Sequence, residues 1–216
     1  MKKLTFTLIL VSLFSVGFSN EAYQKAMSQS IEKLFQAKSI PEYIEQANQF
    51  ERISKTEKTE WLPLYYATFA YIMISFQEPE TAKKDSYLDQ AQKYLDQALA
   101  IDANESELHM LQGFLYPSRI SIDPMGRGAL FVGRMNQSLD KALELNPDNP
   151  RVYYLRATMT FNTPEAYGGG AAKALPLYLT ASEKFSNFRP KTVLSPDWGK
   201  EANEAELKKV QETLNQ

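Results

Sequence analysis

The sequence predicts an all-α protein built from antiparallel helix pairs, and three observations support this prediction. Apolar residues recur with the 3.6-residue period of a helix along most of the chain, with alanines on the same faces. Prolines and turn residues separate the helical stretches. No segment alternates between apolar and polar residues for long enough to form a strand. An ordinary helical bundle is the alternative, because helical periodicity alone does not distinguish it from a repeat array.

The first element is an expected signal peptide over residues 1–19. Two lysines precede an apolar run from Leu4 to Phe18, and small residues close it, which is the order of a secretory signal. We expect cleavage near Ser19 and delivery to a bacterial periplasm. The alternative is an uncleaved anchor, but the run is shorter than the ~20 residues that span a bilayer. We expect no transmembrane segment in the mature chain.

An N-terminal helix pair is predicted over residues 20–58. Apolar residues between positions 21 and 38 share one helical face, and Pro41 opens a second helix, since proline is well accommodated in a first turn. This pair is a candidate degenerate repeat. At the other end, residues 186–216 form a tail whose final helix, from Lys200 to Leu214, is expected to cap the array, because repeat arrays need polar ends.

Three longer helix pairs are predicted over residues 59–185. In the second helix of each pair, a large residue is followed three positions later by Ala98, Ala142 or Ala181, so both lie on one helical face. The alanines allow a neighbouring helix to approach closely. The three pairs are expected at about residues 60–101, 105–145 and 149–185.

This pattern resembles the second helix of a tetratricopeptide repeat (TPR), including the Leu-Asn-Pro-Asp-Asn-Pro exit at residues 145–150. Gly113 and Ala157 stand where the first helix of that family carries a small residue. The resemblance implies a short α-solenoid, a superhelix of helix pairs whose first helices line a concave face. The units are longer than the family's ~34 residues. The extra residues are expected between the paired helices, at residues 77–85, 117–128 and 163–170.

The composition excludes several kinds of chemistry. The chain has no cysteine and a single histidine, His109, so disulfides, thiolate metal sites and multi-histidine sites are ruled out. We expect His109 to pack on a helix rather than act as a base. The glycines at residues 168–170 lack the lysine and hydroxyl residue of a phosphate loop, and indicate a turn. We therefore expect no enzymatic activity, no cofactor and no metal. A net charge of −2 also gives no bulk attraction for nucleic acid.

Three arginines are candidates for an anion contact, because guanidinium groups bind carboxylate and phosphate oxygens well. They are Arg119, Arg127 and Arg134. The alternative, which we favour, is that they form ordinary ion pairs on the surface or between helices.

The TPR resemblance predicts a scaffold that binds a peptide or partner protein on its concave, largely aromatic face, since exposed apolar area of this size indicates a binding site. The predicted partner-binding residues are Trp61, Leu64, Thr68, Tyr71, Glu107, Met110, Phe114, Arg151, Tyr154, Thr158 and Phe161. The alternative function is a periplasmic small-molecule carrier associated with a transporter, with the ligand enclosed between helices. A structural alternative is that a terminal segment covers this face and makes the aromatics part of the core.

Overall fold

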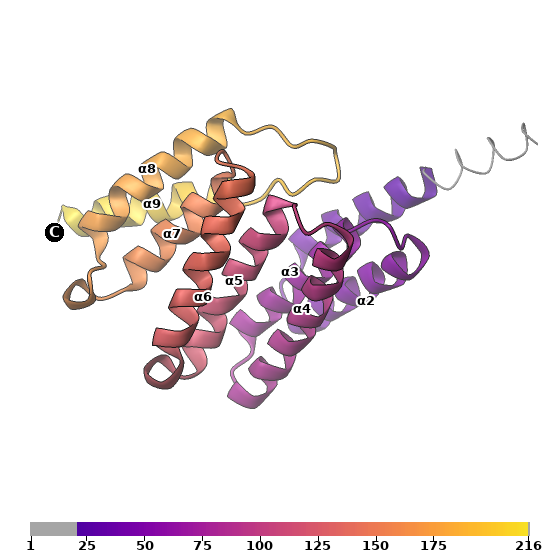
Figure 1. Cartoon of the computed structure of the whole chain (residues 1–216), viewed down its shortest axis with the longest axis horizontal. Helices are drawn as coiled ribbons and strands as arrows, with labels where there is room; N and C mark the ends of the chain where they lie inside the picture. The colour runs from indigo at the N-terminus through magenta and orange to yellow at the C-terminus, as the bar shows by residue number, and fades with distance from the viewer. Residues whose placement is uncertain (1–20, 216) are drawn as a thin grey trace, which may run out of the picture.

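The computed structural model describes residues 21–215, so the expected signal peptide lies outside the described residues. Within that range the chain is helical and contains no strand, which confirms the predicted fold class. Figure 1 shows the helices stacked in chain order, from the N-terminal helix at one end to α8 and α9 at the other. A helix over residues 21–36 is followed by α2 (Ile40–Thr56), α3 (Leu62–Gln77), α4 (Thr81–Ile101), α5 (Ser106–Ile122), α6 (Pro124–Leu145), α7 (Pro150–Asn162), α8 (Ala171–Asn187) and α9 (Lys200–Leu214).

The long helices pack as three pairs, α3 with α4, α5 with α6 and α7 with α8. Helix α2 packs against α3 at one end, and α9 packs against α8 at the other. This arrangement is a TPR-like α-solenoid, as the sequence predicted.

Side chains at the helix starts satisfy backbone N–H groups that have no partner within the helix. The carboxylates of Glu105 and Asp123 and the side-chain amide of Asn149 accept such bonds at the starts of α5, α6 and α7. Pro41 and Pro150 lie in the first turns of α2 and α7, where the missing N–H costs no helical hydrogen bond.

Small residues determine how closely the paired helices approach. Ala98, Ala142 and Ala181 are all fully buried. A Cβ atom added to Gly113 in α5 would lie 2.5 Å from the Cδ2 atom of Leu139 in α6, closer than two carbon atoms can pack. The alanine face of the sequence is therefore the contact face of the pairs.

The extra residues of the second unit are helical, which corrects the expectation of a long connection between its helices. Helix α5 continues past Pro117, and α6 begins at Pro124, so the stretch 117–128 lengthens both helices. A contact with the neighbouring helix pair supports the extension. The hydroxyl oxygens of Ser118 in α5 and Ser75 in α3 lie 2.7 Å apart. Tertiary contacts thus outweigh the cost of an internal proline.

Among the three expected insertions, only residues 163–170 form an irregular connection of some length. It contains the short 3-10 helix Glu165–Tyr167. Gly168 and Gly170 have φ angles of 89° and 97°, a region that favours glycine, as expected for a turn. The stretch 77–85 is mostly helical, because α4 begins within it.

One main core runs along the array from Met27 to Leu155, and it also includes Leu194 from the irregular segment after α8. A smaller core joins α7, α8 and α9 around Tyr178 and Val210. In the part of the chain that the structure describes, no helix is both long and apolar enough to cross a membrane.

Candidate functional site

The segment that links α8 to α9, residues 188–199, lies across the first helices of the pairs, and we call it the strap. Leu194 of the strap is only 5% exposed and belongs to the main core. The Tyr66 hydroxyl of α3 donates to the Leu194 carbonyl at 2.8 Å. The Trp198 indole Nε1 donates to the Tyr65 hydroxyl at 2.8 Å. The strap therefore covers part of the face on which a TPR-like array would bind a partner.

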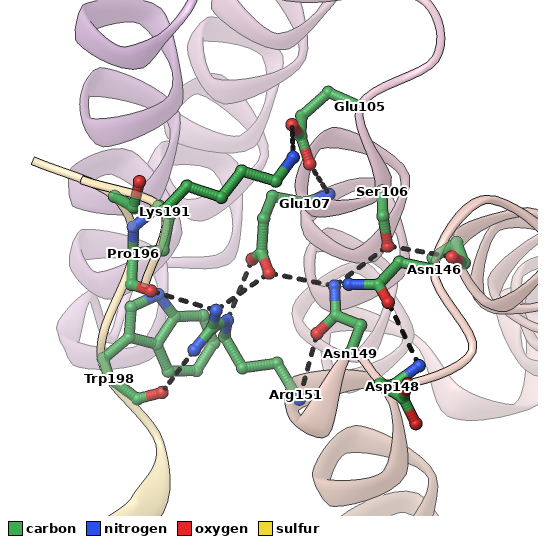
Figure 2. Close-up of polar contacts among 12 residues, drawn as sticks. Glu105, Ser106, Glu107, Asn146, Asp148, Asn149, Arg151, Lys191, Pro196 and Trp198 are labelled. Carbon is green, nitrogen blue, oxygen red and sulfur yellow. Dashed lines mark hydrogen bonds and ion pairs between the residues drawn. The ribbon is translucent and has the colours of Figure 1, made fainter. Parts of the chain in front are cut away.

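A buried ion pair holds the strap. Glu107 lies in the first turn of α5 and Arg151 in the first turn of α7, and Arg151 donates through Nε and Nη2 to the two carboxylate oxygens of Glu107, both at 2.8 Å. Arg151 also donates to the carbonyl oxygens of Pro196 at 3.0 Å and Trp198 at 3.1 Å. Figure 2 shows the guanidinium group between the carboxylate and the strap. We call these four residues the clasp.

Two further polar residues orient Glu107. The Asn149 Nδ2 atom donates to Glu107 Oε1 at 2.9 Å and to Ser106 Oγ at 3.0 Å, and Ser106 Oγ donates to the Ala142 carbonyl at 2.8 Å. Every guanidinium nitrogen of Arg151 and both oxygens of Glu107 thus have a partner (Figure 2). Arg151 is 0% exposed, and a buried charge requires this degree of pairing.

Arg151 keeps its charge over the physiological pH range. Burial alone would lower the pKa of Arg151, but the charge and hydrogen bonds of Glu107 outweigh burial and raise this pKa above its ordinary value. Burial raises the pKa of Tyr65 well above its ordinary value, and the Glu107 carboxylate raises it further. Arg151 therefore stays charged and Tyr65 stays neutral.

Trp198 also lies at the centre of an aromatic cluster beside the clasp. Its ring centroid is 5.0 Å from that of Phe69 in α3 and 5.5 Å from that of Phe114 in α5. The ring of Phe35 lies 5.7 Å from Phe69, and the ring of Phe76 lies 5.6 Å from Phe114. We call these residues the five-ring cluster. Phe35 and Phe76 are 47% and 46% exposed, and Trp198 and Phe114 are half-buried, so the cluster presents an aromatic surface to solvent.

The structure buries part of the predicted binding face. The buried members are Leu64, Thr68, Glu107, Met110 and Arg151. The Thr68 hydroxyl contacts the Ala91 carbonyl of α4 at 3.4 Å, and the ring of Tyr71 stacks on Tyr87 and Tyr94, also in α4. Thr68 and Tyr71 therefore lie between the helices of their own pair. Other residues of α3 form the surface that contacts the strap. At Glu107 and Arg151, the C-terminal tail covers the face that was expected to be open.

The other predicted residues are half-buried and lie in different surroundings. They are Trp61, Phe114, Tyr154, Thr158 and Phe161. Of these, Phe114 belongs to the five-ring cluster. The ring of Tyr154 lies 6.4 Å from that of Tyr178 in α8, and the Lys209 ammonium of α9 lies 5.2 Å from the centre of the Phe161 ring. The structure does not gather the predicted residues into one continuous surface.

Four members of the five-ring cluster were not among the predicted site residues. Phe69 and Phe76 are seven positions apart, which places them on one face of α3, and this spacing was the signal available in the sequence. Phe35 and Trp198 reach the cluster from segments at the two ends of the chain, and no local pattern connects them to α3.

Two of the three arginines considered for an anion contact bind carboxylates of the same chain. Arg119 pairs with two aspartates of α4 at 3.3 and 2.7 Å, and Arg127 binds Asp85 through two hydrogen bonds of 2.8 Å. The guanidinium carbon of Arg134 lies 5.7 Å from the centre of the Phe131 ring. Arg119 and Arg127 thus form ion pairs between helices, the alternative that the sequence analysis favoured.

The side chain of His109 contacts the protein backbone. Its Nε2 atom is 2.9 Å from the carbonyl oxygen of Ala103, in the turn before α5. Across residues 21–215, no group of three or more His, Cys, Asp or Glu side chains is placed to hold a metal ion.

The chain is similar to solved structures but matches no sequence family. No protein-family model matches the chain, and no curated protein matches it. Among solved structures, the HusA haemophore from Porphyromonas gingivalis is similar, with 26% identity and a TM-score of 0.79, over 88% of this chain and 94% of that one. A thermophilic TPR protein from Thermus thermophilus aligns over 88% of this chain and 98% of its own, with 17% identity and a TM-score of 0.45.

Proposed function

We propose that this chain is an exported carrier that binds a flat, largely apolar small molecule of the porphyrin class, such as haem, on the five-ring cluster. The observation that carries the proposal is the likeness to HusA, a haemophore, in fold and at 26% identity over nearly the full length of both chains. A binding role without enzymatic activity and a periplasmic location after cleavage near Ser19 are parts of the same proposal.

The five-ring cluster supports this ligand class. Aromatic side chains bind flat rings by offset or edge-to-face stacking, and they add apolar area that leaves water on binding. Phe35 and Phe76 are each almost half exposed, and they flank the central rings of Phe69, Trp198 and Phe114. A planar ligand on this surface would cover the exposed phenylalanines together.

The proposal does not depend on coordination of the haem iron. The chain has no cysteine, and its single histidine, His109, is engaged with the backbone before α5. Stacking makes no use of the metal. We therefore expect iron-free protoporphyrin to bind about as tightly as haem.

A second candidate function is recognition of an extended peptide, as expected for a TPR-like scaffold. One observation favours it. Arg151 and Tyr66 donate to three backbone carbonyls of the strap, while the Trp198 side chain packs among aromatic rings. Peptide-binding grooves use the same combination of main-chain hydrogen bonds and side-chain pockets. Under this function, a partner segment would compete with the strap.

Titration of the mature chain with haem and with protoporphyrin tests the carrier function, with absorbance and tryptophan fluorescence as readouts. Phe35→Ala and Phe76→Ala should each weaken binding about tenfold, which corresponds to ~1.4 kcal/mol. Tyr167→Ala is the matched control, because Tyr167 is 82% exposed and lies in the 163–170 connection.

Two results would count against the carrier function. One is the absence of saturable binding by the parent protein, and the other is an equal loss of affinity in the Tyr167 control. A peptide retained by protein purified from its own cell envelope, identified by native mass spectrometry, would favour the second candidate instead.

A further inference from the structure

We infer that Trp198 of the strap is a ligand contact and that Arg151 is the positioning residue that holds Trp198 in the aromatic site. The inference rests on the proposed function, because it assigns a positioning residue to the same aromatic site. It goes beyond that function in making ligand affinity depend on a polar contact outside the aromatic surface.

Arg151 binds the strap through the guanidinium N–H groups that are not bonded to Glu107. Two of its hydrogen bonds go to the carboxylate, and two go to the carbonyls of Pro196 and Trp198. The guanidinium carbon also lies 4.6 Å from the ring centre of Phe188 and 5.7 Å from that of Trp198. By itself, a buried ion pair is weak evidence for stability. The more informative property of this pair is that Arg151 also binds the strap.

The strap has further attachments besides the clasp. Tyr66 donates to the Leu194 carbonyl, Lys191 pairs with Glu105, and the Trp198 indole donates to Tyr65. Leu194 is buried, but Val193 beside it is 87% exposed, and Lys191, Thr192 and Asp197 are also exposed. The two carbonyls that Arg151 holds lie on either side of Asp197. Loss of Arg151 would therefore remove the backbone hydrogen bonds at Trp198 and two residues before it.

Trp198 belongs both to the clasp and to the five-ring cluster. Its carbonyl accepts from Arg151, and its ring contacts both Phe69 and Phe114. Without Trp198 in place the cluster loses one of its five rings. The other four stay connected, because the ring centroids of Phe69 and Phe114 lie 6.2 Å apart. The ligand site is thus complete only with Trp198 in place.

The test uses a Trp61→Phe background, in which Trp198 is the only tryptophan, since the chain has two. The double variant Glu107→Leu/Arg151→Met removes both charges, so it buries no unpaired ion and should remain folded. We expect its Trp198 emission to shift to the red and become more accessible to acrylamide, and its affinity for haem to fall at least tenfold. Arg119→Met, which breaks an ion pair away from the strap, should change neither.

The outcomes separate the two proposals. If the background protein itself does not bind haem or protoporphyrin, the proposed function fails, and the positioning role of Arg151 fails with it. If the background binds but the folded double variant has the same affinity, or an unchanged Trp198 spectrum, only the positioning role of Arg151 is overturned. Should the double variant not fold, Arg151→Lys gives the same comparison, because lysine retains the charge but cannot hold both carbonyls and both carboxylate oxygens.

Discussion

Glu107 and Arg151 lie 44 positions apart in the sequence, yet they form a buried, two-point ion pair with N–O distances of 2.8 Å. They occupy equivalent places, the first turns of α5 and α7, so the stacking of consecutive helix pairs brings them together. The pair links the repeat array to the strap, and through the strap to the five-ring cluster.

The first prediction concerns the stability of this pair. Glu107→Leu or Arg151→Met alone should lower the free energy of unfolding by ~3–5 kcal/mol, because each leaves a buried charge without its partner. The double variant should lose far less than the sum of the two. Urea unfolding followed by circular dichroism measures all three. Additive losses would mean that solvent reaches the charges and that the pair is not buried in solution.

The second prediction concerns the alanine face. Ala98→Leu and Ala142→Leu should each destabilise the fold by ~1–3 kcal/mol through overpacking, because both alanines are fully buried between helices. Ala100→Leu is the control, since Ala100 is exposed on the same helix as Ala98. Thermal unfolding distinguishes the sites, and an unchanged midpoint in both buried variants would contradict the packing described above.

The third prediction separates stability from binding on the predicted concave face. The double variant Tyr154→Ala/Phe161→Ala should lose several kcal/mol, as truncation of a buried aromatic costs ~3–5 kcal/mol and these rings are half-buried. Its affinity for haem should match that of the parent, because neither ring belongs to the five-ring cluster. Thermal unfolding and haem titration of one preparation provide both values. A stable variant with lost binding would move the ligand site to α7.

The fourth prediction concerns acid stability. The hydrogen bonds from Arg127, together with its charge and that of Arg119, hold the pKa of Asp85 below its ordinary value. Since this pKa is lower in the folded than in the unfolded chain, the ion pairs add stability above the ordinary aspartate value of ~3.9, and this contribution is lost as pH falls through the lowered value.

Asp85→Asn should therefore be less stable than the parent near neutral pH, and the difference should shrink in acid below about pH 4. Melting temperatures of both proteins across this range measure the effect. A difference that stays constant with pH would show that the substitution acts through packing and not through charge.

The sequence by itself determined the architecture, because the signals for it are local. The spacing from Leu95 to Ala98 and from Leu139 to Ala142 marks one helical face in each unit, and prolines in first turns mark where helices begin. These features depend on residues a few positions apart. The all-α fold and the TPR-like pairs could therefore be predicted, although the helical extension past Pro117 could not, because contacts with other helices stabilise it.

Only the tertiary structure decided what covers the first helices of the pairs and where the aromatic surface lies. The five-ring cluster joins Phe35, Phe69, Phe114 and Trp198 from four separate segments, and the clasp joins α5, α7 and the strap. Residues so distant in sequence share no periodicity, and an irregular segment such as the strap has no propensity that indicates where it packs. Its position depends on long-range contacts, the buried Arg151 hydrogen bonds above all, and these exist only after the helix pairs have stacked.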